Sequence, residues 1–313
     1  SNQSLPKMAT KNLKSLVICT GASRGIGRAV ALAIADAVHA SSNGKSPATG
    51  TIMFSAPLHM ILIARSSECL RETARLVEQR RDASDTISGT PVTTSCHQMD
   101  LSDLDLFPDK LEQILTPLSE EKYGSCLLIN NAGSLGQLGL ASSISGESSM
   151  KEMRKAIDFN VTSSIWVSSQ FIRTFLPSAE ASTAKNPLVR IVNMSSLCAV
   201  EPFPTMSIYC AGKSGRDMFH SVLAKEHSSN LTQNDKGADD KEEQKQTFKV
   251  LNYAPGPCDT QMTDDLAGCA VLDEGLRKYF STSKEEKKLV RPEETAKKLV
   301  QILGLDDYES GSH

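Results

Sequence analysis

The feature that most limits the fold of this chain is a repeated alternation between short apolar runs and longer segments of helical periodicity. The runs are rich in Val, Ile and Leu, and continuous apolar strands of this kind suit a parallel sheet that is covered on both faces. A strand that is followed by a helix and then by another strand is the unit of such sheets. We therefore predict an α/β fold with one doubly wound parallel sheet and helices on both faces. Its strands are expected at residues 15–20, 58–64, 91–99, 126–130, 188–194 and 248–253.

The polar segments of the chain indicate interruptions of a single domain. The length of 313 residues allows one large domain, which we expect to cover residues 15–313 after a polar leader at 1–14. Residues 41–57 are rich in Ser, Gly and Pro, and residues 227–246 are polar and charged. Neither segment carries enough apolar surface to offset its ordering entropy. We expect both to be surface insertions; a solvated loop is the simpler interpretation of the second, and a partner-binding segment is the alternative.

Residues 150–175 carry apolar side chains at helical spacing, which predicts a long helix with one buried face. The same apolar stripe would also suit the interface of a homodimer. The stripe comprises Met153, Ile157, Val161, Ile165, Val167, Phe171 and Phe175.

Charge and cysteine content narrow the classes of partner. Lys and Arg total 34 and Asp and Glu total 37, with no dense basic stripe, so we expect no nucleic-acid partner. No apolar run reaches the roughly 18 residues of a membrane helix, so we expect no membrane partner and a cytoplasmic location. The eight cysteines include no C-x-x-C pair. We favour buried, reduced thiols over a disulfide framework or a zinc site, and we expect no metal.

A glycine-rich turn follows the first predicted strand at residues 20–27, and a helical pattern begins at once. Glycine lets the backbone approach a pyrophosphate closely, and a helix N-terminus offers unpaired N–H groups and a positive dipole to phosphates. A turn of this kind at the first strand of a parallel sheet is typical of a Rossmann-type dinucleotide site, although glycines also serve in plain turns. The expected cofactor contacts here are Gly21, Ser23, Arg24, Gly25, Ile26 and Gly27.

The end of the second predicted strand indicates which dinucleotide binds. Arg65 lies where an NAD-selective site usually carries an acid for the ribose 2′-hydroxyl. A guanidinium presents a fork of charged donors that suits a 2′-phosphate, and Arg24 would assist it. We therefore predict NADPH as the cofactor; the alternative is that Arg65 only opens an exposed helix.

A set of three residues that follow the fifth predicted strand suggests proton transfer. Ser196 follows that strand, and Tyr209 and Lys213 are four residues apart, which places both on one face of a helix. We expect the ammonium of Lys213 to lower the pKa of the Tyr209 phenol from its ordinary value. During reduction of a carbonyl, Ser196 would donate a hydrogen bond to the growing oxyanion and Tyr209 would donate the proton. Tyr-x-x-x-Lys alone is common on helices, so the prediction depends on its combination with the glycine turn and the strand-end Ser.

Taken together these motifs resemble the short-chain dehydrogenase/reductase family. The resemblance runs from residue 15 nearly to the end and includes the turn at 20–27, the Asn-Asn-Ala-Gly string at 130–133, Tyr-x-x-x-Lys at 209–213 and Pro-Gly at 255–256. Within the family, longer strings around these motifs resemble members that reduce carbonyl groups on the side chain of a pterin. The resemblance implies an NADPH-dependent pterin reductase of tetrahydrobiopterin synthesis that acts as a cytosolic homodimer.

The resemblance also implies roles for further residues. Asp100 matches a position that contacts adenine, Thr260 matches one that bonds the nicotinamide carboxamide, and Asn160 matches a helix Asn that supports the proton relay; a satisfied interior polar group is the alternative for Asn160. Lys213 would also hold the nicotinamide ribose. The remaining expected cofactor contacts are Asn131, Ala132, Gly133, Tyr209, Pro255 and Gly256, and the expected substrate contacts are Ser196, Leu197, Cys198 and Tyr209.

The resemblance places the start of a last strand, with an Asp that anchors the pterin ring, at residues 309–313, and no Asp occurs in these residues.

Two other functions are consistent with the motifs. A broad reductase of diketones or quinones would use Leu197, Cys198, Phe203 and Met206 as an unspecific apolar pocket. A non-catalytic NADPH-binding sensor is the third, but such a protein has no need of a proton donor beside the nicotinamide.

Overall fold

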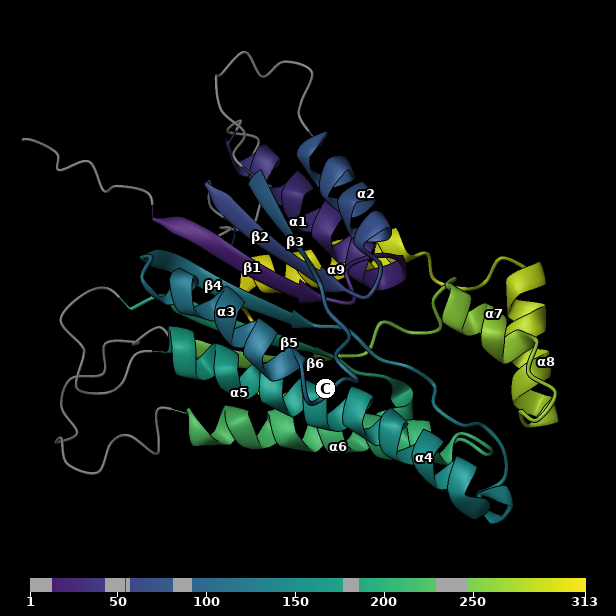
Figure 1. Ribbon diagram of the computed structural model, residues 1–313. Helices are drawn as coiled ribbons and strands as arrows, with labels where there is room; N and C mark the ends of the chain where they lie inside the picture. The colour runs from purple at the N-terminus through teal and green to yellow at the C-terminus, as the bar shows by residue number, and fades with distance from the viewer. Residues whose placement is uncertain (1–12, 43–53, 55–56, 81–91, 177–185, 229–246) are drawn as a thin grey trace, which may run out of the picture.

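Six parallel strands form one sheet at the centre of the computed structural model, which describes residues 13–42, 54, 57–80, 92–176, 186–228 and 247–313 (Figure 1). The strand order is β3-β2-β1-β4-β5-β6, the doubly wound order of a Rossmann-type sheet. The predicted α/β fold class is therefore confirmed. The strands are β1 (Lys14–Thr20), β2 (Leu58–Ala64), β3 (Val92–Gln98), β4 (Tyr123–Asn130), β5 (Leu188–Met194) and β6 (Phe248–Tyr253).

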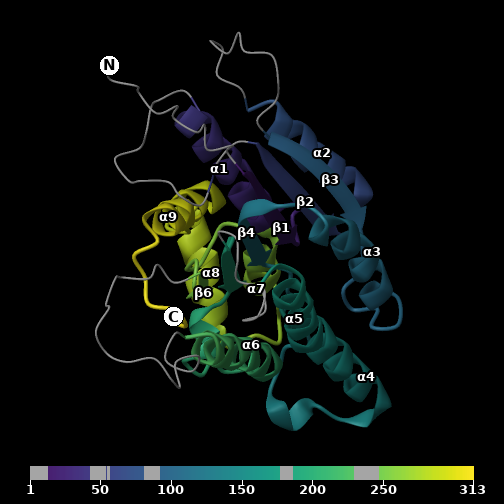
Figure 2. The same cartoon turned by 90° about the vertical axis from the view of Figure 1, so that its left-hand side faces the viewer.

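Helices cover both faces of the sheet. Figure 2 shows α1 and α9 on one side of the strands and α3 and α5 on the other. Each layer has its own apolar core against the sheet. The first layer consists of α1 (Gly25–Ser42), α2 (Ser67–Glu78) and α9 (Pro292–Leu305), and the second of α3 (Phe107–Ser119), α5 (Ser163–Phe175) and α6 (Ser207–Glu226).

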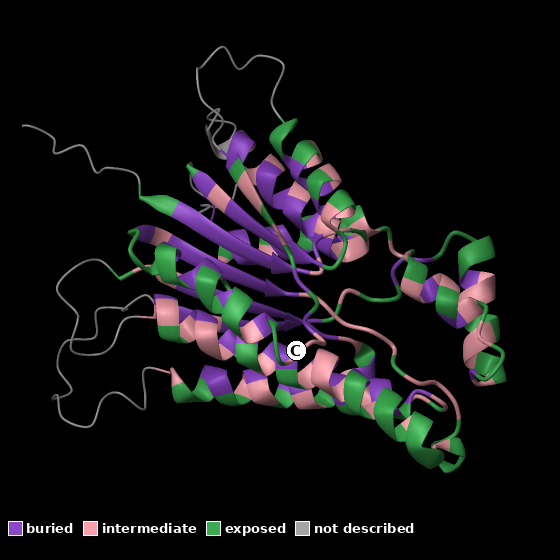
Figure 3. Ribbon diagram, in the orientation of Figure 1, coloured by how far each residue is buried: buried purple, intermediate pink, exposed green. Residues whose placement is uncertain are grey.

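The strand sequences follow from this two-sided burial. In β1, Val17 and Cys19 pack into the first core while Leu16 and Ile18 pack into the second. A central strand therefore needs apolar residues at every position, and Figure 3 shows the central strands buried along most of their length. The edge strand β3 is half-exposed, which explains its polar composition of Thr, Ser, His and Gln.

The predicted boundaries agree closely with the structure. The predictions for β2, β5 and β6 coincide with the observed strands, and β4 begins three residues earlier, at Tyr123. Lys14, which was expected in the leader, is the first residue of β1. The insertions expected at 41–57 and 227–246 lie mostly outside the described residues.

The helix predicted at residues 150–175 is divided into three parts. It consists of α4 (Gly146–Ile157), the π-helical segment η2 (Asp158–Thr162) and α5. The apolar stripe is buried at Val167, Phe171 and Phe175 but only half-buried at Met153. A π-helical segment adds one residue to a turn and shifts the face that follows, so a single 3.6-residue period does not describe the whole stretch.

Two short helices and the last residues complete the edge of the sheet at which the strands end. After β6 come α7 (Gln261–Ala267) and α8 (Glu274–Glu285), which pack against the short helix η4 (Leu197–Ala199) and the start of α6. The segment at 310–312 pairs with β6, because the amide of Gly311 donates to the Val250 carbonyl at 2.8 Å and that of Asn252 donates to Ser312 at 2.9 Å.

Two kinds of feature are absent from the described residues. None of their helices combines the length and apolar character that a membrane span needs. In the same part of the chain, no three His, Cys, Asp or Glu side chains are grouped as metal ligands would be.

Candidate active site

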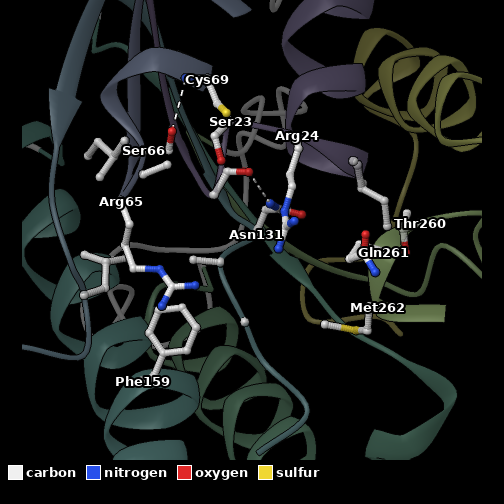
Figure 4. Close-up of a pocket in the computed structure, with 18 of the residues that line it drawn as sticks. Ser23, Arg24, Arg65, Ser66, Cys69, Asn131, Phe159, Thr260, Gln261 and Met262 are labelled. Carbon is white, nitrogen blue, oxygen red and sulfur yellow. Dashed lines mark hydrogen bonds between the residues drawn. The ribbon is translucent and has the colours of Figure 1, made fainter. Parts of the chain in front are cut away.

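A cavity of about 410 Å³ lies where β1, β2 and β4 end, which is the usual ligand position in a doubly wound sheet (Figure 4). Most of the predicted cofactor contacts line it. They are Gly21, Ser23, Arg24, Gly25, Ile26, Arg65, Asn131, Ala132, Gly133 and Thr260.

The glycine turn needs its glycines for two different reasons. Gly21 and Gly25 have φ of 67° and 55°, a conformation that other residues rarely adopt. A Cβ on Gly27 would lie 2.3 Å from the carbonyl oxygen of Gly21. Gly27, which is also an expected cofactor contact, does not line the cavity; it faces the turn and permits the close approach of the turn to α1. The first turn of α1 carries no acid, so its N–H groups face the cavity with their positive dipole unopposed.

The turn at Asn131 is fastened to the glycine turn by hydrogen bonds. The Asn131 side-chain amide donates to the carbonyl oxygens of Thr20 and Gly21 at 3.0 and 3.2 Å. The backbone amides of Asn131 and Ala132 both donate to the Thr20 hydroxyl at 3.0 Å. A dinucleotide bound in the cavity would therefore contact two turns that form one rigid unit.

Arg24 and Arg65 approach the cavity from opposite sides (Figure 4). The guanidinium carbon of Arg65 lies 6.0 Å from the centre of the Phe159 ring. The cavity lining contains no Asp or Glu among the described residues. This donor set fits an anionic dinucleotide, and its two guanidinium groups suit an additional phosphate.

Asp100 lies beside the cavity and not in its lining, although its neighbours Met99 and Leu101 line it. Its carboxylate accepts hydrogen bonds from the amide and hydroxyl of Ser102 at 2.9 and 2.7 Å. Burial raises the pKa of Asp100, but these bonds and the nearby charge of Arg65 outweigh that effect and lower the pKa overall. The predicted adenine contact is therefore not among the groups that face the cavity.

Ser196 and Tyr209 are brought together at the start of α6. The Ser196 hydroxyl caps η4 by accepting from the Cys198 amide at 3.2 Å, and it lies close enough to the Tyr209 hydroxyl to affect its pKa. That hydroxyl lies 3.9 Å from the sulfur of Met262, a residue of the cavity lining. Tyr209 is 7% exposed and does not itself line the cavity. Met262 thus separates the phenol from the cavity.

Burial raises the pKa of Tyr209, whereas the sequence predicted a lowered pKa. Desolvation, aided by the neighbouring Cys198, raises the pKa of the phenol above its ordinary value, and the nearby Ser196 hydroxyl and the charge of Arg216 only partly oppose this. Lys213 lies on the same helix face, but its Nζ is 5.6 Å from the centre of the Tyr209 ring. The predicted lowering of the pKa by Lys213 is therefore wrong for this arrangement.

Lys213 is directed at the end of β5. Its Nζ donates to the Met194 carbonyl oxygen at 2.7 Å, and the side chain is buried. Burial, with a further contribution from the Arg216 cation, lowers the pKa of Lys213 from 10.5 to about 7. Lys213 does not line the cavity either. This lysine therefore changes its charge near neutral pH.

Asn160 pairs both ends of its side-chain amide with the backbone of one residue. Its Oδ1 accepts from the amide of Ser134, and its Nδ2 donates to the carbonyl of the same residue, both at 2.9 Å. A Cβ on Gly212 would lie 3.2 Å from the Asn160 Cβ, so α6 packs directly against this side chain. These contacts join the π-helical segment, the loop after β4 and α6, and the role of Asn160 in the proton relay stays a prediction.

The other predicted residues divide between the apolar cluster and the strand ends. Cys198 is buried with Met206 and Leu266, whereas Leu197 is 48% exposed. Two further expected cofactor contacts fall outside the cavity lining and form the turn that leads from β6 toward Thr260: Pro255 and Gly256.

Sequence reasoning missed several lining residues. Phe159 immediately precedes Asn160, and Met262 follows Thr260 by two positions, so the neighbours of motif residues were the available signal. Whether a neighbour faces the cavity depends on the turn it occupies, which its type does not reveal. The missed residues are Ile63, Ala64, Ser66, Cys69, Met99, Leu101, Phe159, Gln261 and Met262.

Comparisons with known proteins agree with this geometry. A family model described as short chain dehydrogenase matches residues 44–233. Sepiapterin reductase of Meriones unguiculatus is 31% identical, over 96% of this chain and 95% of its own length, and that of Xenopus tropicalis is 28% identical over 98% of each. A benzil reductase of Bacillus subtilis is 24% identical over 92% of this chain and 93% of its own length.

Solved structures share the fold. The KRED1-Pglu enzyme has a TM-score of 0.65 at 19% identity, covering 95% of this chain and 99% of that chain. Levodione reductase has a TM-score of 0.64 at 19% identity, covering 96% and 95%. The family model, the sepiapterin reductase relatives and the shared fold together establish that this chain is an oxidoreductase that belongs to the short-chain dehydrogenase family and is similar to the sepiapterin reductases.

Proposed function

We propose that this chain uses NADPH to reduce carbonyl groups on the side chain of a pterin, such as sepiapterin or 6-pyruvoyl-tetrahydropterin, in tetrahydrobiopterin synthesis. The observation that carries the reductase chemistry is the contact between Ser196 and Tyr209 beside a cavity with two guanidinium groups. The pterin is supported by relatives that are named sepiapterin reductase and align over nearly the whole chain.

The proposed roles follow from the contacts of each residue. The cavity would hold a reduced nicotinamide cofactor, which would supply the hydride for the carbonyl carbon. Ser196 donates a hydrogen bond to the carbonyl oxygen, and Tyr209 donates the proton. The raised pKa of Tyr209 keeps the phenol protonated at neutral pH until a substrate oxyanion accepts its proton. Lys213 lies beside the ring, with its Nζ 5.6 Å from the ring centre. The sulfur of Met262 has to leave the phenol before a substrate oxygen reaches it.

The choice of NADPH rests on charge. Arg24 and Arg65 would contact the 2′-phosphate, and the cavity lining includes no acid, among the described residues, that would bind a free 2′-hydroxyl. Thr260 lies at the end of the lining that also holds Met262, which supports its proposed bond to the nicotinamide carboxamide.

We also propose that the enzyme is a cytoplasmic homodimer. Trp166 on α5 and Met218 and Val222 on α6 are 43%, 67% and 43% exposed, and these two helices pack together on the same face of the sheet. A second copy would cover these apolar groups. All eight cysteines are free thiols, as expected in a reducing compartment.

The test is a comparison of substrates. Purified protein is mixed with NADPH and sepiapterin, and the loss of NADPH absorbance is followed; a parallel series uses NADH, and another uses the diketone benzil. Preference for sepiapterin over benzil in kcat/KM supports the proposal, and absence of turnover with sepiapterin contradicts it.

The second candidate function is broad carbonyl reduction. It is favoured by the apolar cluster of Cys198, Met206, Leu266 and Leu272 around Tyr209, which offers few polar groups to select a substrate, and by the benzil reductase relatives. Higher kcat/KM with benzil than with sepiapterin would establish it.

A further inference from the structure

One fully buried cation lies beneath the proposed active site. Arg216 is 0% exposed and lies on α6, three residues after Lys213. Each nitrogen of its guanidinium donates a hydrogen bond. Nη1 donates to the Ala132 carbonyl at 2.7 Å, Nη2 to the Asn130 carbonyl at 2.6 Å, and Nε to the Asn193 side-chain oxygen at 2.9 Å.

These three bonds join three elements that the proposed reaction must align. Asn130 ends β4, and Ala132 lies in the following turn, which lines the cofactor cavity. Asn193 lies near the end of β5, next to the Met194 carbonyl that holds Lys213. Arg216 itself lies on the helix that carries Tyr209 and Lys213. One planar group therefore sets the cofactor turn against the helix of the proton donor.

The turn fits between Arg216 and a second polar side chain. A Cβ on Gly133 would lie 3.3 Å from Asn160 Oδ1 and 3.7 Å from Arg216 Nη1. Gly133 can therefore occupy this narrow space while its backbone lines the cavity. A shift of the guanidinium would move the turn.

If Arg216 served packing alone, a guanidinium would be energetically unfavourable at this buried position. Burial of a charge is unfavourable, and the three acceptors of Arg216 are two carbonyls and one amide, all of them neutral. Burial lowers the pKa of Arg216 to about 10, so the group still carries its charge at neutral pH. The neighbouring carboxylate of Asp217 is hydrogen-bonded to Asn193 and Ser195.

The charge acts on both proposed proton-transfer residues. It is the second largest cause, after burial, of the lowered pKa of Lys213, and it opposes the raised pKa of Tyr209. The titratable groups around Lys213 and Tyr209 are Arg216 and Asp217 on α6, Cys210 beside Tyr209, Cys198 on η4, and His313 of the C-terminal segment, which contacts Asp217.

We propose that Arg216 is a positioning residue, whose guanidinium holds the Asn130–Gly133 turn, the end of β5 and α6 in the alignment that the reaction needs. This inference deepens the proposed function and rests on it for the reaction. The contact of Arg216 with the cofactor turn is independent of which carbonyl is reduced.

The test compares Arg216→Met with the wild type in NADPH affinity, kcat and pH dependence. We expect weaker NADPH binding, measured by NADPH fluorescence, and a fall in kcat of about 10- to 100-fold, the scale of a small misplacement of reacting groups. Because the Arg216 charge lowers the pKa of Lys213, its removal should move the decline of kcat with rising pH to higher pH. A change in packing alone would not shift the pH at which kcat declines.

Arg190→Met is the matched control. Arg190 is also 0% exposed, but it pairs with Asp306, away from the cavity lining. We expect Arg190→Met to lower the melting temperature and to leave unchanged the pH at which kcat declines. The proposal would be overturned if the pH at which kcat declines shifted equally in both variants. It would also be overturned if Arg216→Met kept the kcat and the NADPH affinity of the wild type.

A second variant covers failure of Arg216→Met to fold. Arg216→Lys carries one amine that cannot reach all three acceptors, so NADPH affinity and kcat should both fall. Wild-type values of both would overturn the positioning role of the three guanidinium hydrogen bonds. Weaker NADPH binding in Arg216→Lys together with no turnover of sepiapterin or benzil by the wild type would refute the proposed function and leave the role in the cofactor turn standing.

Discussion

Replacement of Tyr209 by Phe removes one oxygen atom from the proposed proton donor and leaves its ring in place. The ring packs with Cys198, Met206 and Leu266, and these contacts remain. The lost hydroxyl lies near Ser196 and 3.9 Å from the sulfur of Met262, and even a full hydrogen bond contributes a net of only about 0.5–1.5 kcal/mol to stability. A fold of this size tolerates such a loss, so Tyr209→Phe should remain folded.

The effect on the reaction should be much larger. Loss of a general acid reduces turnover by about 10²- to 10⁴-fold, which corresponds to about 3 to 5 kcal/mol in the barrier. Because Tyr209 does not line the cofactor cavity, NADPH affinity should stay close to that of the wild type. We expect a loss in kcat of at least about 100-fold with little change in the Kd of NADPH.

Three measurements check this prediction: kcat from NADPH absorbance, Kd from NADPH fluorescence, and the melting temperature. Tyr253→Phe is the matched control, because Tyr253 is 8% exposed and its hydroxyl bonds to Thr295 at 2.8 and 3.0 Å. It loses a comparable buried hydroxyl and should keep its activity. Retention of kcat in Tyr209→Phe, or an equal loss in Tyr253→Phe, would refute the assignment of the proton donor.

Three other predictions address the cofactor, the lysine and the fold. Arg65→Ala should raise the KM for NADPH far more than that for NADH, because in the proposed complex the guanidinium pairs with the 2′-phosphate, which NADH lacks; equal losses in steady-state kinetics would count against this role. Burial lowers the pKa of Lys213 to about 7, so the lysine loses its positive charge as the pH rises through 7. If the reaction needs this cation, kcat at saturating NADPH should fall between about pH 6 and 9, and a flat profile would contradict the need. Asp306→Asn breaks a pair with the buried Arg190, whose Nη2 lies 2.7 Å from the carboxylate, and should cost about 3 kcal/mol in urea unfolding; the exposed Asp307→Asn should cost little, and similar values for both would show that the pair is unimportant.

Local patterns in the sequence were sufficient for the sheet and for the glycine turn. Strands β2, β5 and β6 match their predictions residue for residue, because burial on both faces requires apolar side chains at every position of a central strand. Gly21 and Gly25 were recognisable because a tight turn into a helix demands a backbone conformation that favours glycine. Tyr209 and Lys213 share a helix face because four residues make about one turn.

The packing of distant segments decided the rest of the site. The spacing of Tyr209 and Lys213 predicted their proximity, but only the packing of α6 directs the amine to Met194 and buries the phenol, which reverses the expected direction of its pKa. The contacts of Met262 with the phenol and of Arg216 with Ala132 join residues 53 and 84 positions apart. A pKa and a cavity lining depend on every group that surrounds a side chain in space, and a linear pattern records only the neighbours along the chain.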